Sequence, residues 1–337
     1  MLDTVRPVNQ AEFAKLAEPH RHELQVHCYR MLGSLQDAED LVQEALLRAW
    51  QKIDTYEGRA SFRAWLYKIA TNACLDALDR RPRRKLPQAN RSASDPAAPP
   101  APPNTEPIWL EPIPDELIAD VDTSPEARYD ARESITLAFL AALQVLPPRQ
   151  RAVLLLRDVL DVRAEQVGQL LDLTLSSVNS LLHRARVTLA KHYHARDVES
   201  IKAMPSDDQM CALLDRYVRA WEAADVDALI SLLKEEATLA MPPSPSWYKG
   251  KAAIREFVAG MISLMNASGR WRFEPTRANS QPAFAWYQRE ADGVFHAFAI
   301  QVVTFDGALI ADMTTFMNPA LFKYFNLAQD LDASNEL

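Results

Sequence analysis

The chain has 337 residues, more than one ordinary domain holds, so two or three domains are expected. Gly is scarce at 8 residues whereas Pro reaches 22, which favours helical domains joined by a Pro-rich connector. The three cysteines contain no C-x-x-C pair, which argues against a disulfide framework. The sequence shows no secretory signal and no apolar run long enough to span a membrane, so a cytoplasmic protein is expected.

The net charge of −8 is unevenly distributed along the chain. Residues 59–85 carry eight basic and two acidic side chains, and residues 132–196 carry nine basic and five acidic ones. Acidic blocks follow each of these basic islands. This division is typical of a protein that binds a polyanion such as nucleic acid.

Residues 12 to 84 predict successive amphipathic helices. In DAEDLVQEALLRAW, which begins at Asp37, apolar residues recur at helical spacing and the opposite face is acidic. One apolar residue, Leu47, lies within that acidic face. The pattern fits either a solvated surface or a docking face for another protein.

The next predicted helix, in SFRAWLYKIATNACLDALDRR, carries Trp65, Lys68 and Asn72 on one flank. An aromatic ring, an amine and an amide suit melted DNA, because they stack on bases, contact phosphates and bond base edges. The preceding loop holds Arg59 and suits an extruded base, and the arginines from Arg80 onward add phosphate contacts. Taken singly, these features also fit the rim of a core and a solvated tail.

Residues 86–128 have neither helical nor strand periodicity and are dense in Pro and Ala, which predicts an extended tether. Within the tether, PIWLEPIPDELI is too apolar for a free linker. We expect this stretch to dock onto a folded domain; the alternative is an isolated apolar patch.

Beyond the tether, a helix over 149–160 leads to a short helix around 164–171, a turn at DLT and a further helix from about Leu175. The last helix has a small-polar and basic outer face. Two short helices joined by a tight turn predict a helix-turn-helix that reads a major groove, with an ordinary helical hairpin as the alternative.

In this order the three motifs resemble the sigma-70 family of bacterial RNA polymerase initiation factors, in its extracytoplasmic-function (ECF) class. The resemblance implies a docking face for core polymerase at Asp37, Asp40, Leu41, Gln43, Glu44 and Leu47. It implies −10 promoter contacts at Arg59, Ser61, Phe62, Trp65, Lys68, Asn72, Arg80 and Arg81. It implies −35 contacts at Ser176, Ser177, Asn179, Ser180, His183, Arg184 and Arg186. Three departures lie in the helix-turn-helix: Asp172 stands where the turn usually has Gly, Gly168 stands where a small helix former is commoner, and Asn179 stands where a basic residue is frequent.

Residues 206 to 325 open with helices and finish with alternating, aromatic-rich runs, which predicts an α+β domain. This part resembles the SnoaL-like branch of the NTF2-like superfamily, a cone in which a curved sheet encloses a pocket. ECF subgroups with a fused SnoaL-like domain share the whole arrangement, and the resemblance implies regulation in cis. Candidate pocket residues are Trp221, Trp247, Tyr248, His296, Phe298 and Asp312. Some SnoaL relatives use Asp/His pairs as cyclases or isomerases, so catalysis, ligand sensing and purely structural regulation stay open.

The sequence thus predicts a multidomain protein with two all-α sigma domains and a C-terminal α+β NTF2-like cone. The predicted boundaries are region 2 at 10–85, a Pro-rich acidic linker at 86–130, region 4 at 131–196 and the SnoaL-like domain at 205–327. We expect a sigma factor, not an enzyme, without metal or cofactor. Its expected partners are core RNA polymerase, through the largest-subunit coiled coil and the flap, and promoter DNA, with a small-molecule ligand as a further candidate. The alternative is a SnoaL-type protein that binds or converts a small molecule and carries a DNA-binding leader.

Overall fold

The computed structural model describes residues 10–56, 58, 61–80, 84–89, 92–103, 109–118, 134–192, 207–265 and 270–332. The chain forms two compact units: Met1–Arg84 with Glu116–Tyr193, and Lys85–Asp115 with His194–Leu337. The described elements of the first unit are helical, and the second unit combines helices with a sheet, so the predicted fold class is confirmed. Within the described residues, no helix is both long and apolar enough to cross a membrane. No cluster of His, Cys, Asp or Glu in that part of the chain could hold a metal ion.

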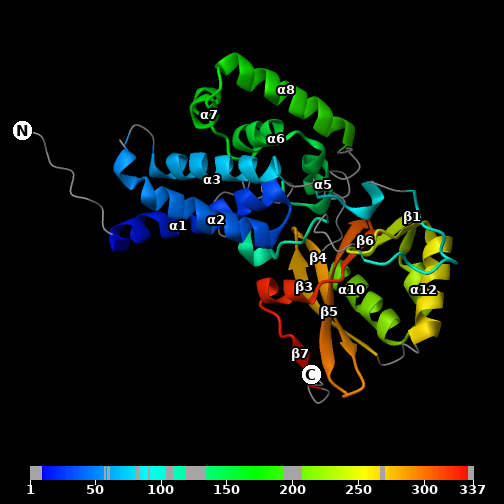
Figure 1. Cartoon of the computed structure of the whole chain (residues 1–337). Helices are drawn as coiled ribbons and strands as arrows, with labels where there is room; N and C mark the ends of the chain where they lie inside the picture. The colour runs from blue at the N-terminus through cyan, green and yellow to red at the C-terminus, as the bar shows by residue number, and fades with distance from the viewer. Residues whose placement is uncertain are drawn as a thin grey trace, which may run out of the picture. The chain divides into compact units, whose positions relative to one another are not determined.

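The first unit begins with a helical bundle (Figure 1). Its elements are α1 (Gln10–Leu32), α2 (Leu35–Gln51), the 3-10 turn η1 (Ile53–Thr55) and α3 (Phe62–Leu78). Ser34 begins α2, because its hydroxyl accepts a hydrogen bond from the Asp37 N–H at 3.2 Å. Ser61 begins α3 in the same way, by accepting from the Ala64 N–H at 3.2 Å.

The bundle core contains a histidine that the sequence does not mark as buried. The His27 ring packs on Tyr67 and bonds the Thr71 hydroxyl at 2.9 Å. Burial, with the nearby charge of Arg30, lowers the pKa of His27 to about 3. His27 is therefore neutral at physiological pH.

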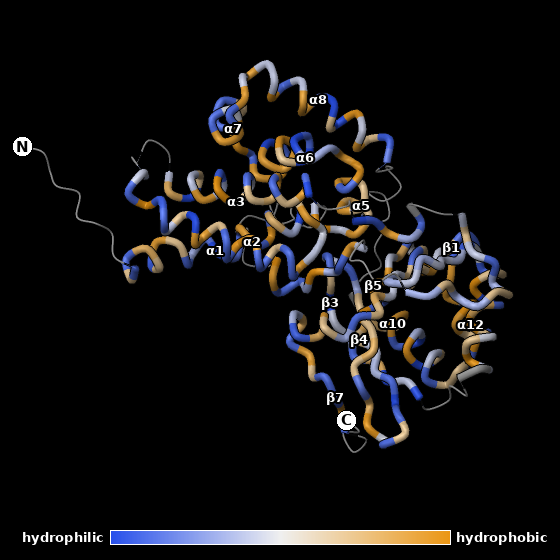
Figure 2. Tube along the Cα trace, in the orientation of Figure 1, coloured by the Kyte–Doolittle hydropathy of each residue, from blue (hydrophilic) through white to orange (hydrophobic). Residues whose placement is uncertain are grey.

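The second half of the first unit comprises α5 (Leu137–Val145), α6 (Pro148–Leu154), a π-helical turn η4 (Leu155–Val159), α7 (Ala164–Leu171) and α8 (Leu175–His192). Hydrophilic and hydrophobic residues alternate along α8, as its amphipathic pattern predicts (Figure 2). The fully buried Arg151 of α6 joins the two halves. Its guanidinium donates to the Met31 carbonyl at the end of α1 and to the Gln144 side chain at 2.6 Å.

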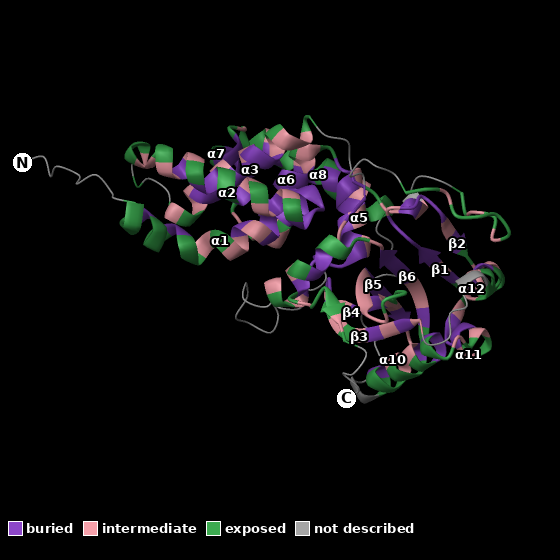
Figure 3. Cartoon of the chain, turned by 60° about the horizontal axis from the view of Figure 1, so that its bottom comes forward, coloured by how far each residue is buried: buried purple, intermediate pink, exposed green. Residues whose placement is uncertain are grey.

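The second unit contains one mixed sheet with helices packed on it. Its elements are α10 (Asp207–Glu222), α11 (Val226–Ser231), β1 (Leu233–Ala240), β2 (Trp247–Lys249), α12 (Lys251–Met265), β3 (Trp271–Ala278), β4 (Gln281–Arg289), β5 (Phe295–Asp306), β6 (Leu309–Phe316), η5 (Pro319–Phe325) and β7 (Asp330–Leu331). The strand order is β2-β1-β6-β5-β4-β3, with β7 added to β5. β1 and β6 are parallel, and the other neighbours are antiparallel. The strands are largely buried, whereas α10 and α12 expose their outer sides (Figure 3).

Part of the linker packs within the second unit. It forms the 3-10 turn η2 (Pro87–Ala89), and η3 (Asp115–Leu117) follows where the chain returns to the first unit. Trp109, Leu110 and Ile113 are buried, as expected for an apolar stretch that docks onto a folded domain. The Ile113 N–H donates to the Asn279 side chain at 3.1 Å, and the Asn279 N–H donates to the Ile113 carbonyl at 2.9 Å. This pair of bonds ties the linker to the turn between β3 and β4.

Candidate functional site

The acidic face of α2 is exposed for most of its length. Asp40, Gln43, Glu44 and Leu47 are exposed and follow one another at helical spacing, while Val42, Ala45 and Ala49 are buried on the other side. The Leu47 side chain, at 56% exposure, is unusually open for a leucine. This arrangement is an apolar residue within a polar rim, which is typical of a protein-docking surface.

Two predicted members of that face lie differently. Leu41 is half-buried at the edge of the core. The Asp37 side chain is only 16% exposed, because Arg84, in the basic run that follows α3, donates to it at 2.7 Å. Asp37 is therefore engaged in an ion pair with Arg84 inside the bundle.

The N-terminal part of α3 belongs to a cluster of aromatic rings. Phe62 lies 5.6 Å from Tyr56 and 5.6 Å from Trp65, measured between ring centroids, and Tyr56 and Trp65 are 5.2 Å apart. Phe62 and Trp65 are half-buried, so both pack in the cluster and keep part of their surface open. Such half-open rings suit base stacking.

The polar −10 candidates differ in their exposure and in their hydrogen bonds. Asn72 is half-buried, Arg80 is exposed, and Ser61 serves as the helix cap. Arg59 and Arg81 lie outside the described residues. Lys68 is engaged inside the first unit: its ammonium donates to the Asp172 carboxylate at 2.9 Å and to the Gln169 carbonyl at 3.1 Å. Asp172 and Gln169 belong to α7 and its turn, so Lys68 joins α3 to the helix-turn-helix.

The outer face of α8 is open to solvent. Ser176, Asn179, Ser180, His183 and Arg184 are exposed, and Val178, Leu182 and Ala185 form the buried stripe. Small polar and basic side chains on an exposed helix match the requirements of major-groove recognition.

Two further −35 candidates have partners within the unit. Ser177 shares the cap of α8, because its hydroxyl lies 2.8 Å from the Thr174 hydroxyl and its N–H donates to that oxygen at 3.2 Å. The Arg186 guanidinium forms a two-bond ion pair with Asp158 at 2.7 and 2.9 Å. Because the Arg186 side chain remains largely exposed, exchange of Asp158 for a phosphate needs little rearrangement.

Helix α7 and the turn that follows it accommodate two of the departures from the family pattern, Gly168 and Asp172. Asp172 adopts the left-handed conformation that Gly usually supplies, with φ 53° and ψ 48°. A Cβ at Gly168 would lie 2.8 Å from the Leu173 carbonyl oxygen. The Leu173 N–H also donates to the Gly168 carbonyl at 2.8 Å, so the turn folds directly against this glycine. Gly168 is thus required by a close approach of the backbone.

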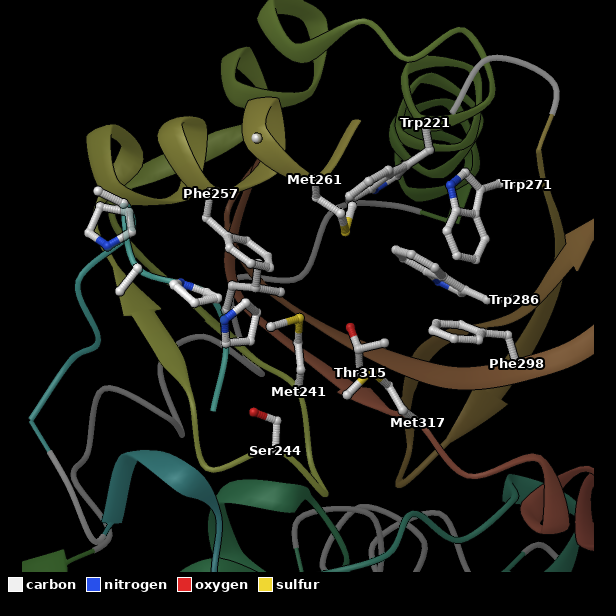
Figure 4. A pocket seen from close by; sticks show the side chains of 17 residues that line it. Trp221, Met241, Ser244, Phe257, Met261, Trp271, Trp286, Phe298, Thr315 and Met317 are labelled. Atoms are coloured by element: carbon white, nitrogen blue, oxygen red, sulfur yellow. The ribbon is translucent and has the colours of Figure 1, made fainter. Parts of the chain in front are cut away.

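The second unit has a partly open cavity of about 470 Å³ between the sheet, α10 and α12. Trp221, Trp271, Trp286 and Phe298 gather at one end of it, while Phe257 and Met241 lie toward the other (Figure 4). Trp271 and Trp286 meet edge to face, with centroids 5.6 Å apart. The lining is Pro96, Ala97, Ala98, Pro99, Pro100, Trp221, Leu239, Met241, Ser244, Phe257, Gly260, Met261, Trp271, Trp286, Phe298, Thr315 and Met317.

Of the six predicted pocket residues, Trp221 and Phe298 line this cavity and the other four do not. Trp247 pairs along β2, and Tyr248 stacks on Phe257 of α12 at 4.2 Å. Asp312 lies on the opposite face of β6 from Met313, which packs in the core. Its carboxylate accepts from the Thr238 hydroxyl at 2.5 Å, and burial raises its pKa.

His296 lies beside the turn between β4 and β5, where two carboxylates hold it. Its ring nitrogens contact Asp330 at 2.6 Å and Asp292 at 3.0 Å. The hydrogen bonds to Asp292 and Asp330 raise the pKa of His296. His296 and Asp312 therefore form no acid–base pair, and the expectation that they share the pocket is corrected.

Sequence reasoning missed two tryptophans and the linker in this site. The sequence identified Trp271 and Trp286 only as aromatic residues of strands. It did not show which face of the sheet they occupy, because the face depends on strand register. The contribution of Pro96 to Pro100 could not be inferred, since a Pro-rich segment has no pattern that specifies what it covers.

The comparisons with known proteins follow this division of the chain. Residues 16–84 match the model of sigma-70 region 2, residues 136–189 match sigma-70 region 4, and residues 214–313 match the SnoaL-like domain. The ECF RNA polymerase sigma factor SigG of Mycobacterium tuberculosis is 42% identical over 323 residues, which cover 96% of this chain and 85% of SigG. SigW of Bacillus subtilis, another ECF sigma factor, is 30% identical over 189 residues, which cover 56% of this chain and 91% of SigW.

A solved structure has a similar fold over most of this chain. The crystal structure of the Mycobacterium tuberculosis ECF sigma factor SigJ covers 94% of this chain and 100% of its own, with a TM-score of 0.58 and 21% identity. The matches to sigma-70 regions 2 and 4, the match to the SnoaL-like domain and the alignment of SigG over 96% of this chain all indicate the same family. The chain therefore belongs to the ECF RNA polymerase sigma factors that carry a SnoaL-like domain.

Proposed function

We propose that this sigma factor binds core polymerase through the exposed face of α2, opens and reads the −10 element with α3, and reads the −35 element with α8. The relatives are sigma factors by name, and the exposed faces of α2 and α8 have the chemistry that these roles require. Its place of action would be the cytoplasm, with core polymerase and promoter DNA as partners.

The observation that carries the proposal is the contact between α3 and the helix-turn-helix turn. Lys68, a −10 candidate, is bonded to Asp172 and to the Gln169 carbonyl. The two parts that would contact promoter DNA are bound to each other in the free chain. We infer that binding to core polymerase separates them, so that the free protein binds promoter DNA poorly.

We also propose that the SnoaL-like domain regulates initiation in cis, through the linker. The linker segment Lys85–Asp115 belongs to the second unit, yet it connects the two helical halves of the first. About 30 residues could span roughly 100 Å if they were extended and free. Docking of the linker on the SnoaL-like domain shortens that reach, and with it the distance to which regions 2 and 4 can separate.

Run-off transcription with core polymerase tests these proposals. Full-length protein is compared with a form stopped after residue 200 and with the full-length variant Asn279→Gly, which removes the side chain that bonds Ile113. The matched control is Ser280→Gly, because both residues have positive φ and Ser280 uses its backbone N–H to bond Asp115. We expect Asn279→Gly and the shortened form to change promoter output in the same direction. Silence of all forms on a broad promoter library would refute the sigma function, and equal output from all forms would refute regulation in cis.

The alternative of a small-molecule-converting enzyme has less support. The side chains that line the cavity, within the described residues, are apolar apart from Ser244, Thr315 and the indole groups. Proton transfer of the kind used by SnoaL-like isomerases requires an acid or base there. We therefore propose a binding role for the cavity.

A further inference from the structure

The exposed face of α8 has an open hollow near the start of the helix. The side chains that line it are Leu175, Ser176, Asn179, Ser180 and His183. Two of them are unusual on a face that meets water. Leu175 is an apolar side chain at 45% exposure, and the exposed amide of Asn179 makes no hydrogen bond to the described residues. Both side chains are therefore available to a partner that lies against this face.

The Asn179 amide presents one donor group and one acceptor group side by side. In the major groove adenine offers the complementary pair, a donor at N6 and an acceptor at N7, whereas guanine offers two acceptors, O6 and N7. An amide therefore pairs with adenine through two bonds, and a basic side chain pairs with guanine. Because Asn179 stands where a basic residue is frequent in the family, the base expected at this position follows from this chain's own residue.

The other polar side chains near Asn179 do not offer such a pair of bonds. Ser176 and Ser180 are exposed hydroxyls, which bond several bases and discriminate little between them. Their small size leaves room for a base edge to approach the amide. Ser177 shares the cap of α8, and Arg186 is paired with Asp158. Within the hollow, Asn179 is thus the side chain that matches one base through two bonds.

Leu175 supplies an apolar contact on the same face. Thymine is the base that carries a methyl group in the major groove, and an apolar side chain recognises it there. Leu175 precedes Asn179 by four residues, which places both on one face of the helix. Four residues rise by about 6 Å along a helix, and two base-pair steps of about 3.4 Å cover nearly the same distance. The two contacts would therefore fall about two base pairs apart.

We propose that Asn179 reads an adenine of the −35 element through hydrogen bonds to N6 and N7, and that Leu175 contacts the 5-methyl group of a thymine about two base pairs away. This inference rests on the proposed reading of the −35 element by α8. It adds which two residues discriminate between bases and which base each of them selects.

Selection from a promoter library with a randomised −35 element tests the role of Asn179. Holoenzyme made from core polymerase and the full chain should prefer adenine about 5- to 150-fold at one position. We expect Asn179→Ala to lose this preference at that position alone, and Asn179→Arg to change it to guanine. The matched control is Gln166→Ala, which removes an exposed amide from α7 and should leave every base preference unchanged. An adenine preference that persists in Asn179→Ala would overturn the assignment.

Base analogues test the two contacts in the unaltered protein. 7-Deazaadenine lacks the N7 acceptor, so at the selected position it should weaken promoter binding about two- to tenfold, with no further loss in Asn179→Ala. Deoxyuridine lacks the 5-methyl group, so in place of the thymine it should weaken binding about fourfold, with no further loss in Leu175→Ala. Equal losses in the unaltered protein and the variants would overturn these contacts. No thymine preference about two base pairs from the adenine would overturn the contact of Leu175.

The outcomes separate this inference from the function on which it rests. Holoenzyme that initiates without a base preference at any −35 position would overturn both the reading by α8 and the role of Asn179. A −35 preference that His183→Ala alters and Asn179→Ala does not would leave the reading by α8 intact and overturn the role of Asn179 alone.

Discussion

Replacement of Leu47 by Ala should weaken binding to core polymerase without weakening the fold. Burial of a whole leucine side chain contributes about 1.5–3 kcal/mol. Because 56% of Leu47 is exposed in the free chain, docking can add only about that share, roughly 0.8–1.7 kcal/mol. The expected loss is therefore about 4- to 18-fold in Kd.

The assay is a fluorescence-anisotropy titration of labelled sigma factor with core polymerase. Leu309→Ala is the control, since Leu309 is 38% exposed on β6 of the second unit and should leave Kd unchanged. Thermal unfolding of the two variants should match that of the unaltered protein within about 0.5 kcal/mol. An unchanged Kd for Leu47→Ala would refute the assignment of this face, and equal losses for the two variants would indicate non-specific adhesion.

Three further perturbations test other parts of the reasoning. Gly168→Ala should destabilise the helix-turn-helix in spite of the better helix propensity of Ala, whereas Gly260→Ala should stabilise α12 by up to about 1 kcal/mol. Urea unfolding measures the stability of both variants. A gain in stability for Gly168→Ala would contradict the close contact between Gly168 and the Leu173 carbonyl. His27 is neutral when folded but takes up a proton near pH 6.5 when unfolded, so its contribution to stability is complete above pH 6.5 and declines by about 1.4 kcal/mol per pH unit toward 3. An NMR titration in which the His27 ring protonates near pH 6.5 in the folded protein would refute this. Asp172→Asn removes the charge that attracts Lys68 and leaves its bond to the Gln169 carbonyl. It should tighten binding of the free protein to a single-stranded −10 probe by up to about fivefold at low salt, with no change if the contact does not limit access.

The helices of the first unit could be predicted from periodicity and caps, because their signals are local. Ser34, Ser61 and Thr174 each precede an apolar stripe of period 3.6, and helices begin there. The spacing also placed Leu47 on the exposed face of α2. The partner of Asp37 could not be predicted in this way, because Arg84 lies 47 residues further along the chain.

The strands were predicted where they alternate and missed where they do not. β3 to β6 are rich in aromatic and β-branched residues, and their sequences indicate strands. β1, with the sequence LKEEATLA, contains residues that are uncommon in strands. Its conformation depends on parallel pairing with β6, which follows about 70 residues later. The same dependence on distant pairing hid the environment of Asp312, which pairs with Thr238 of β1.

The parallel pairing of β1 with β6 has a consequence for the order of events during synthesis. The helices of the first unit are complete once residue 192 has been made, but the sheet lacks the strand that joins β1 to β5 until residues 309–316 follow. At translation rates of about 5–20 residues per second, the intervening stretch of about 120 residues takes roughly 6–24 s. During that interval the promoter-reading helices of each new molecule have been synthesised, but the SnoaL-like domain on which the linker docks is incomplete. A nascent chain should therefore pass through a stage in which regions 2 and 4 are not yet restrained by the domain that follows them.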